Sequence, residues 1–178
     1  MSVRWLVPVL TFVLGGASML VGLAQAGRLA PARPEALVAL AQIVEVEHRR
    51  VDLLLERHDE AGAIAALEAL RGQRWPSRED GGDLGEQLRH DVYGRLVRLR
   101  LDYPEVDPQT DEALLQVVAD GLGPDYREVE TNPFTARLVA LRGELLEERG
   151  RDGEALGAYE EALEMNRRLL ELELAEVP

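Results

Sequence analysis

Apolar residues recur every three or four positions through most of the chain after residue 34, which is the spacing of an amphipathic α-helix. These rows predict helices over residues 34–57, 60–71, 83–102, 108–120, 133–150 and 153–176. Long runs of β-branched residues, which favour strands, are missing. We therefore expect an all-α fold.

Helix boundaries are marked by capping residues and breakers. Asp59, Asp107 followed by Pro108, and Asn132 followed by Pro133 each have the form of an N-cap, and proline is favoured at the first helical position. Residues 72–82 contain Trp75-Pro76 and a glycine pair, and they predict a loop. In the last helix we expect one face to be buried, with Ala155 and Ala162 as small contacts; it comprises Leu156, Tyr159, Leu163, Asn166 and Leu170.

The six helices group into three antiparallel hairpins that begin near residues 34, 83 and 133. A repeat at such a spacing is typical of a helical solenoid. The predicted organisation is an N-terminal segment over 1–26, a linker over 27–33, a first hairpin over 34–76, a second over 77–132 and a third over 133–178.

The third hairpin resembles a tetratricopeptide repeat over residues 136–168. Gly143 stands where the first helix of that family needs a small residue, and Gly150 stands at the turn. The second-helix positions are matched by Ala155, Tyr159, Ala162 and Leu163. Arg142 and Arg167 depart from the pattern, which has a leucine and a helix-ending proline there. The first hairpin matches only through Ala63 and Leu67, and the middle hairpin does not match. The resemblance implies a TPR-like solenoid that binds a protein or peptide and has no catalytic role.

Residues 5–23 are uncharged and mostly apolar, and as a helix they are just long enough to cross a bilayer core. They are followed by Ala24-Gln25-Ala26, which has the form of a signal-peptidase site. Two interpretations stay open. An uncleaved anchor predicts a single-pass protein of the bacterial inner membrane with its body in the periplasm. Cleavage near Ala26 predicts a secreted or periplasmic protein.

Charge and composition narrow the possible partners. The net charge is −13, and all 20 basic residues are arginine, as is typical of a GC-rich bacterial genome. Such an acidic chain is unsuited to nucleic acid, because that binding depends on neutralising phosphates. The absence of cysteine excludes disulfides and thiolate metal ligands.

Candidate chemistry is sparse. Ser77 precedes Arg78, Glu79 and Asp80 and fits a helix cap better than a nucleophile, and the sequence has no phosphate-binding glycine motif. His48 and His58, with Glu45 and Asp52 near His48, are weak candidates for a transition-metal site, and solvated surface histidines are the favoured interpretation. His90 is expected to be ordinary in the same way. We expect no enzyme activity and no cofactor.

The pattern therefore predicts a membrane-tethered, exported helical scaffold that binds another envelope protein. Two alternatives stay open: a periplasmic metal or stress sensor that uses His48 and His58, and a structural subunit of a larger membrane complex. Self-association through the helix over 34–57 is a further possibility.

Overall fold

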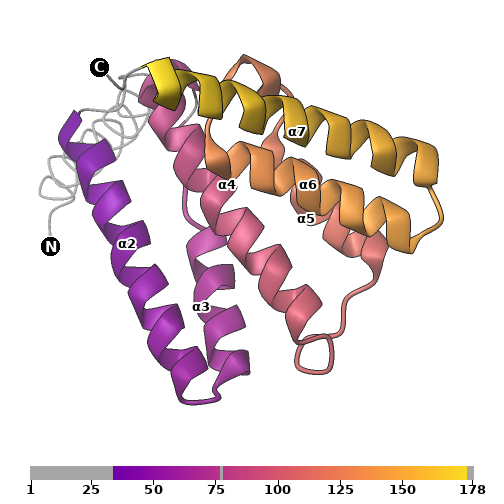
Figure 1. Ribbon diagram of the computed structural model, residues 1–178. Helices are drawn as coiled ribbons and strands as arrows, with labels where there is room; N and C mark the ends of the chain where they lie inside the picture. The colour runs from indigo at the N-terminus through magenta and orange to yellow at the C-terminus, as the bar shows by residue number, and fades with distance from the viewer. Residues whose placement is uncertain (1–33, 77, 176–178) are drawn as a thin grey trace, which may run out of the picture. The chain divides into compact units, whose positions relative to one another are not determined.

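The computed structural model describes residues 34–76 and 78–175, which form six α-helices and a short 3-10 helix without any β-strand (Figure 1). The elements are α2 (Pro34–Glu56), α3 (Glu60–Arg71), α4 (Arg78–Asp102), α5 (Asp111–Leu122), η2 (Tyr126–Glu128), α6 (Pro133–Glu148) and α7 (Asp152–Ala175). The predicted all-α class is confirmed for this part of the chain.

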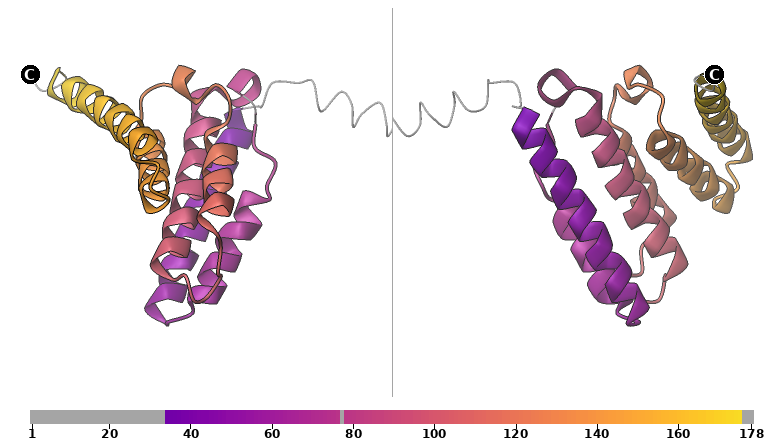
Figure 2. Two further views of the ribbon diagram at one scale, coloured as in Figure 1. Left: turned by 90° about the vertical axis from the view of Figure 1, so that its right-hand side faces the viewer. Right: turned by 60° about the vertical axis from the view of Figure 1, so that its left-hand side comes forward.

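Helices adjacent in sequence pack side by side in three pairs, α2 with α3, α4 with α5 and α6 with α7. The pairs also pack on one another: α4 contacts α2 and α3, and α6 contacts α4 and α5. In Figures 1 and 2 the α6–α7 pair runs at an angle to α2 and α3. Each of the first two hairpins is therefore covered by the first helix of the next one.

Local capping explains most of the helix boundaries. The Asp59 carboxylate accepts a hydrogen bond from the Gly62 backbone N–H at 2.9 Å, and the Asn132 side chain accepts from the backbone N–H groups of Phe134 and Thr135. Gly150 ends α6 with a left-handed φ of 66°, and the next backbone N–H bonds to the Leu146 carbonyl at 2.9 Å. This is the glycine-terminated helix end expected from the sequence.

One predicted boundary is wrong, and a second is right only for the long part of α4, which begins after Gly82. The cap of α5 is Thr110, whose hydroxyl accepts a hydrogen bond from the Ala113 N–H at 3.2 Å. Asp107, the predicted cap, instead accepts a hydrogen bond from Arg100 at 2.8 Å. The expected loop over 72–82 is shorter than predicted, since helical residues resume at Arg78. A non-helical Gly82, with φ 59° and ψ −160°, kinks the chain before the long part of α4.

The main core runs through all three hairpins. Its fully buried side chains include Val51 and Leu67 of the first hairpin, Leu96 of the second and Leu138 of the third. Because apolar side chains from successive hairpins meet in one cluster, each hairpin depends on its neighbours for burial of its apolar face.

The expected burial of the leucines of α7 is wrong, whereas its predicted small contacts Ala155 and Ala162 are confirmed. The helix packs on α6 through Ala155, Ala158 and Ala162, whereas Leu156 and Leu163 remain exposed. The reason is close approach: a Cβ atom at Gly143 would lie 2.7 Å from the Tyr159 ring, so α6 and α7 meet where their side chains are smallest. Leucine does not fit between backbones that close.

No helix within residues 34–76 and 78–175 has the length and apolar character needed to span a membrane. The predicted anchor or signal over residues 5–23 lies outside the described residues.

Candidate functional site

A groove runs between α5 and α7 and holds a volume of about 560 Å³. Leu115, Leu146 and Ala158 supply apolar lining, and the latter two are buried against each other. Charged side chains border it, including Glu112 and Arg151. The groove therefore has a mixed lining, in which apolar side chains lie next to charged ones. We call it the α5–α7 groove.

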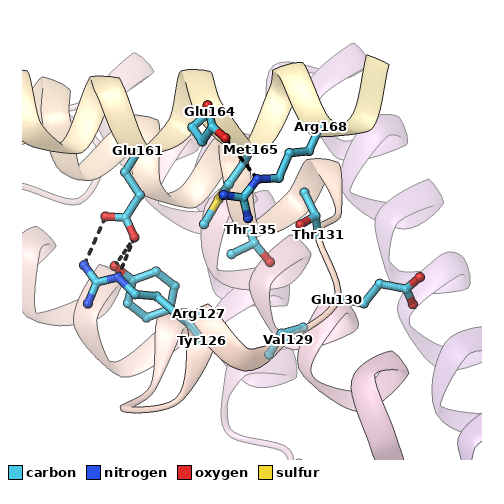
Figure 3. A pocket seen from close by; sticks show the side chains of 10 residues that line it. All are labelled: Tyr126, Arg127, Val129, Glu130, Thr131, Thr135, Glu161, Glu164, Met165 and Arg168. Carbon is cyan, nitrogen blue, oxygen red and sulfur yellow. Dashed lines mark hydrogen bonds and ion pairs between the residues drawn. The ribbon is translucent and has the colours of Figure 1, made fainter. Parts of the chain in front are cut away.

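A smaller hollow of about 190 Å³ lies between α7 and the segment that contains η2 (Figure 3). It is lined by Tyr126, Arg127, Val129, Glu130, Thr131, Thr135, Glu161, Glu164, Met165 and Arg168. Arg127 and Glu161 line both this hollow and the α5–α7 groove. The two spaces are therefore neighbours with one ionic pair between them.

Glu161 of α7 is the centre of that boundary. Its carboxylate accepts hydrogen bonds from Arg127 Nε at 2.8 Å, from the Tyr126 hydroxyl at 2.8 Å and from Arg142 Nη2 at 2.8 Å. The Arg127 and Arg142 guanidinium carbons also lie 4.9 and 5.8 Å from the centroid of the Tyr126 ring, within cation–π range. Four side chains from η2, α6 and α7 thus form one network.

The electrostatics of Glu161 follow from these contacts. Burial alone would raise the pKa of its carboxyl, but the hydrogen bonds from Arg127, Tyr126 and Arg142 outweigh burial and hold the pKa below its ordinary value. Burial raises the pKa of the Tyr126 hydroxyl, and the bond to Glu161 adds to that shift. At neutral pH Glu161 is therefore a fixed anion that holds two arginines in place.

We predict that Glu161→Gln lowers the free energy of unfolding by about 1–2 kcal/mol, because two guanidinium groups lose a shared, partly buried carboxylate. The control is Glu164→Gln, one turn further along α7. Its pair with Arg168 is 3.1 Å long but exposed, so we expect a change below about 0.5 kcal/mol. Urea denaturation at neutral pH measures both. Equal effects would mean that the network contributes no more than an exposed ion pair.

A buried chain of hydrogen bonds lies behind the small hollow. Asn132 Nδ2 donates to Thr135 Oγ1 at 2.8 Å, which lies 2.7 Å from His90 Nδ1, and His90 Nε2 lies 3.2 Å from the Leu122 carbonyl. A carbonyl oxygen only accepts hydrogen bonds, so neutral His90 carries its proton on Nε2. Its Nδ1 then accepts a hydrogen bond from the Thr135 hydroxyl. Burial lowers the pKa of His90 to about 4. The expectation that His90 is an ordinary surface residue is wrong.

The spacing of Thr135 and His90 matches that of a nucleophile and its base. Thr135 is only 2% exposed and His90 is fully buried, so both side chains are withdrawn from solvent. The hydrogen bonds from Asn132 through Thr135 and His90 to Leu122 link α4, the end of α5 and the start of α6. Arg89 adds to the contact between α4 and the end of α5 by donating hydrogen bonds to the carbonyls of Gly121 and Leu122 at 2.9 and 3.1 Å.

The structure gives the two proposed metal ligands different surroundings. His48 Nδ1 lies 3.4 Å from Asp91 of α4, burial lowers its pKa, and Nε2 is buried without a hydrogen-bond partner. His58 is exposed, and its left-handed φ of 57° ends α2. Asp52, expected near His48 as a ligand, pairs with Arg95. Within the described part of the chain, no group of three or more such side chains is placed to hold a metal ion.

The residues of the repeat-like pattern are partly brought together. Gly143 faces the Tyr159 ring, and Ala155 and Ala162 are buried. Leu163 is the exception among the expected packing residues, because it is 50% exposed. Arg142, which departs from the repeat pattern, is the residue that joins the Glu161 network. The repeat pattern usually has a leucine at this position, so an arginine here is a feature of the sequence that could have indicated the network.

The fold and the groove together define an all-helical array of hairpins with a cleft beside its last helix. Comparisons with protein-family models, with curated proteins and with solved structures find no match for this chain.

Proposed function

We propose that this protein is a helical scaffold that binds a segment of a partner protein in the α5–α7 groove. The observation that carries the proposal is the groove itself, which has a volume of about 560 Å³ and is lined by apolar and charged side chains together. Protein interfaces likewise combine apolar and polar surface.

The packing order of the helices supports a TPR-like solenoid. In such arrays each repeat is one helical hairpin that contacts only its neighbours. The order α2–α3, α4–α5, α6–α7, with α4 and α6 each covering the preceding hairpin, is consistent with this class.

The site is proposed to act at a membrane. Residues 5–23 carry no charge and are long enough to anchor the chain in the inner membrane, and the helical body then faces the periplasm. An anchor of this kind raises the effective concentration of the scaffold beside a membrane-bound partner without any additional contact.

The test uses a photo-crosslinking residue in the full chain, expressed in intact cells. We expect a substitution at Gln116, which is exposed at the groove, to capture a discrete protein. The same substitution at Gln73, which is exposed between α3 and α4, should capture none.

A pair of glycines on α7 makes the test specific. Gly157 lines the groove, and a Cβ atom added there would meet nothing within 4 Å, so Gly157→Trp introduces a large side chain at the groove. Gly153 has the same open surroundings outside the groove and provides the matched control. We expect Gly157→Trp to reduce the Gln116 adduct at least about tenfold and Gly153→Trp to preserve it. An adduct that survives Gly157→Trp, or no adduct above background, would contradict the proposal.

A further inference from the structure

A row of leucines runs along the exposed side of α7. Leu156, Leu163 and Leu170 are spaced seven residues apart, and Leu174 continues the row. Their exposed fractions are 59, 50, 59 and 64%. Single exposed leucines are ordinary on protein surfaces, but four on one side of one helix are an unusual concentration of exposed apolar side chains.

This row lies on a different side of α7 from both its packing face and the α5–α7 groove. At about 100° of rotation per residue, the three seven-spaced leucines fall about 90–130° around the helix from the middle of the face formed by Ala155, Ala158 and Ala162. Gly157 and Glu161, which line the groove, fall on the opposite edge. A ligand in the groove therefore leaves the leucine row uncovered.

The helix array shows what kind of element covers such a surface. α3 packs against α2 and against α4, and α5 packs against α4 and against α6. α7 packs chiefly against α6, and no described helix follows it. In this chain the second helix of a hairpin is thus normally covered by one further helix, and α7 presents leucines instead.

Charge identifies the chemistry of that helix. α7 carries seven acidic residues and two arginines. Glu160 and Arg167 of α7 lie beside the row on one side, and on the other side the end of α6 carries Glu147, which accepts a hydrogen bond from the Tyr159 hydroxyl at 2.7 Å. The hydrogen bond to Glu147 is the chief cause that raises the pKa of Tyr159 to about 12. A row of leucines in surroundings that are acidic on balance is complementary to a helix with basic borders.

We propose that the leucine row of α7 docks an amphipathic helix of a partner protein, whose apolar face is flanked by arginine or lysine. The docked helix lies along α7 in the place that a first helix of a next hairpin would take. A second copy of this chain is disfavoured as the occupant, because its own net charge of −13 meets an acidic border. This surface is separate from the α5–α7 groove and does not depend on it.

The test uses three labelled peptides of about 20 residues, since shorter helices are marginal in water. One carries leucines at helical spacing flanked by lysines, the second replaces the lysines by glutamates, and the third has the basic composition with its leucines scrambled. Fluorescence anisotropy with the full chain in mild detergent measures each affinity. We expect the first peptide to bind at least about tenfold more tightly than the other two.

Variants locate the site. The double variant Leu163→Ser with Leu170→Ser retains every charge. We expect it to lower the affinity for the first peptide at least about tenfold. The control is Leu53→Ser, which removes an equally exposed leucine from α2 and should leave the affinity unchanged. Circular dichroism shows whether each variant keeps its helices.

Four outcomes would overturn the proposal. Equal binding of the ordered and scrambled basic peptides, or equal binding by the double variant, would reduce the interaction to general charge attraction. A dimer of the full chain that dissociates on Leu163→Ser with Leu170→Ser, measured by sedimentation, would make a second copy the occupant. A crosslink from position 163 to residues 1–33 of the same chain would make its own N-terminal segment the occupant.

Discussion

Leu138→Ala is expected to lower the free energy of unfolding by about 3–4 kcal/mol. Leu138 of α6 is fully buried in the core that joins the three hairpins. Truncation removes several buried carbon atoms and leaves a cavity that a close-packed helix interface fills only in part. Urea denaturation of the full chain, followed by circular dichroism, measures the change.

Leu163→Ala is the matched control, because both leucines belong to the α6–α7 hairpin and both fall on predicted apolar faces. Leu163 is half-exposed in the structure, so its truncation should change the free energy of unfolding by less than about 0.5 kcal/mol. A loss at Leu163 as large as the loss at Leu138 would mean that α7 buries its leucine row in the free protein. It would contradict the packing of α7 described above.

The contrast between these leucines shows which features the sequence predicts well. The bounds of α3 are predicted to the residue, and the Asp59 and Asn132 caps are confirmed, because each depends on a hydrogen bond within three residues. The cap of α5 is predicted wrongly because Asp107 forms a contact with Arg100, seven residues away. Capping residues predict helix ends well unless another side chain forms a hydrogen bond with the capping group.

The face of α7 could not be chosen from periodicity. The alanine row and the leucine row both have helical spacing, and hydrophobicity favours the leucines. The deciding quantity is the distance between helix backbones, which Gly143 makes short enough for Tyr159 to pack directly on α6. That distance is a property of the pair of helices and is not encoded in either one alone.

The candidate site was largely beyond prediction for the same reason. Glu161 meets Tyr126 and Arg127 across more than 30 residues of sequence, and one glutamate among the acidic residues of α7 carries no local mark. Arg142 is the partial exception, since it stands out against the repeat pattern. Charged networks between hairpins depend on the tertiary arrangement, which helical periodicity does not specify.

His90 leads to the second large prediction, a loss of stability in mild acid. The folded pKa is about 4, below the ordinary value of 6.5, because burial disfavours the imidazolium ion. The unfolded chain therefore binds more protons than the folded one between these values, and stability falls as the pH decreases from 6.5 towards 4. The contribution of His90 is about 1.3 kcal/mol between pH 7.5 and 5.5 and about 3 kcal/mol by pH 4.

The upper pH window separates this effect from that of the carboxylates. Glu161 and Asp107 also have lowered pKa values, but their stabilisation is lost only as the pH falls through the range below the ordinary carboxyl value of about 4–4.5. Denaturation at pH 7.5 and 5.5 thus reports mainly on histidine. His48, whose pKa is lowered by burial, contributes in the same direction and is unchanged in a variant of His90 alone.

The measurement compares His90→Gln with the unmodified protein. Glutamine keeps a donor for the Leu122 carbonyl but cannot take up a proton, so the variant should be less stable at pH 7.5 and should lose about 1.3 kcal/mol less on acidification to pH 5.5. His58→Gln removes an exposed imidazole and serves as the control. If His90→Gln shows the same acid slope as the unmodified protein, His90 is not held neutral in the folded state. The assigned direction of the Asn132–Thr135–His90 hydrogen-bond chain then fails, because a charged imidazole donates from both nitrogens.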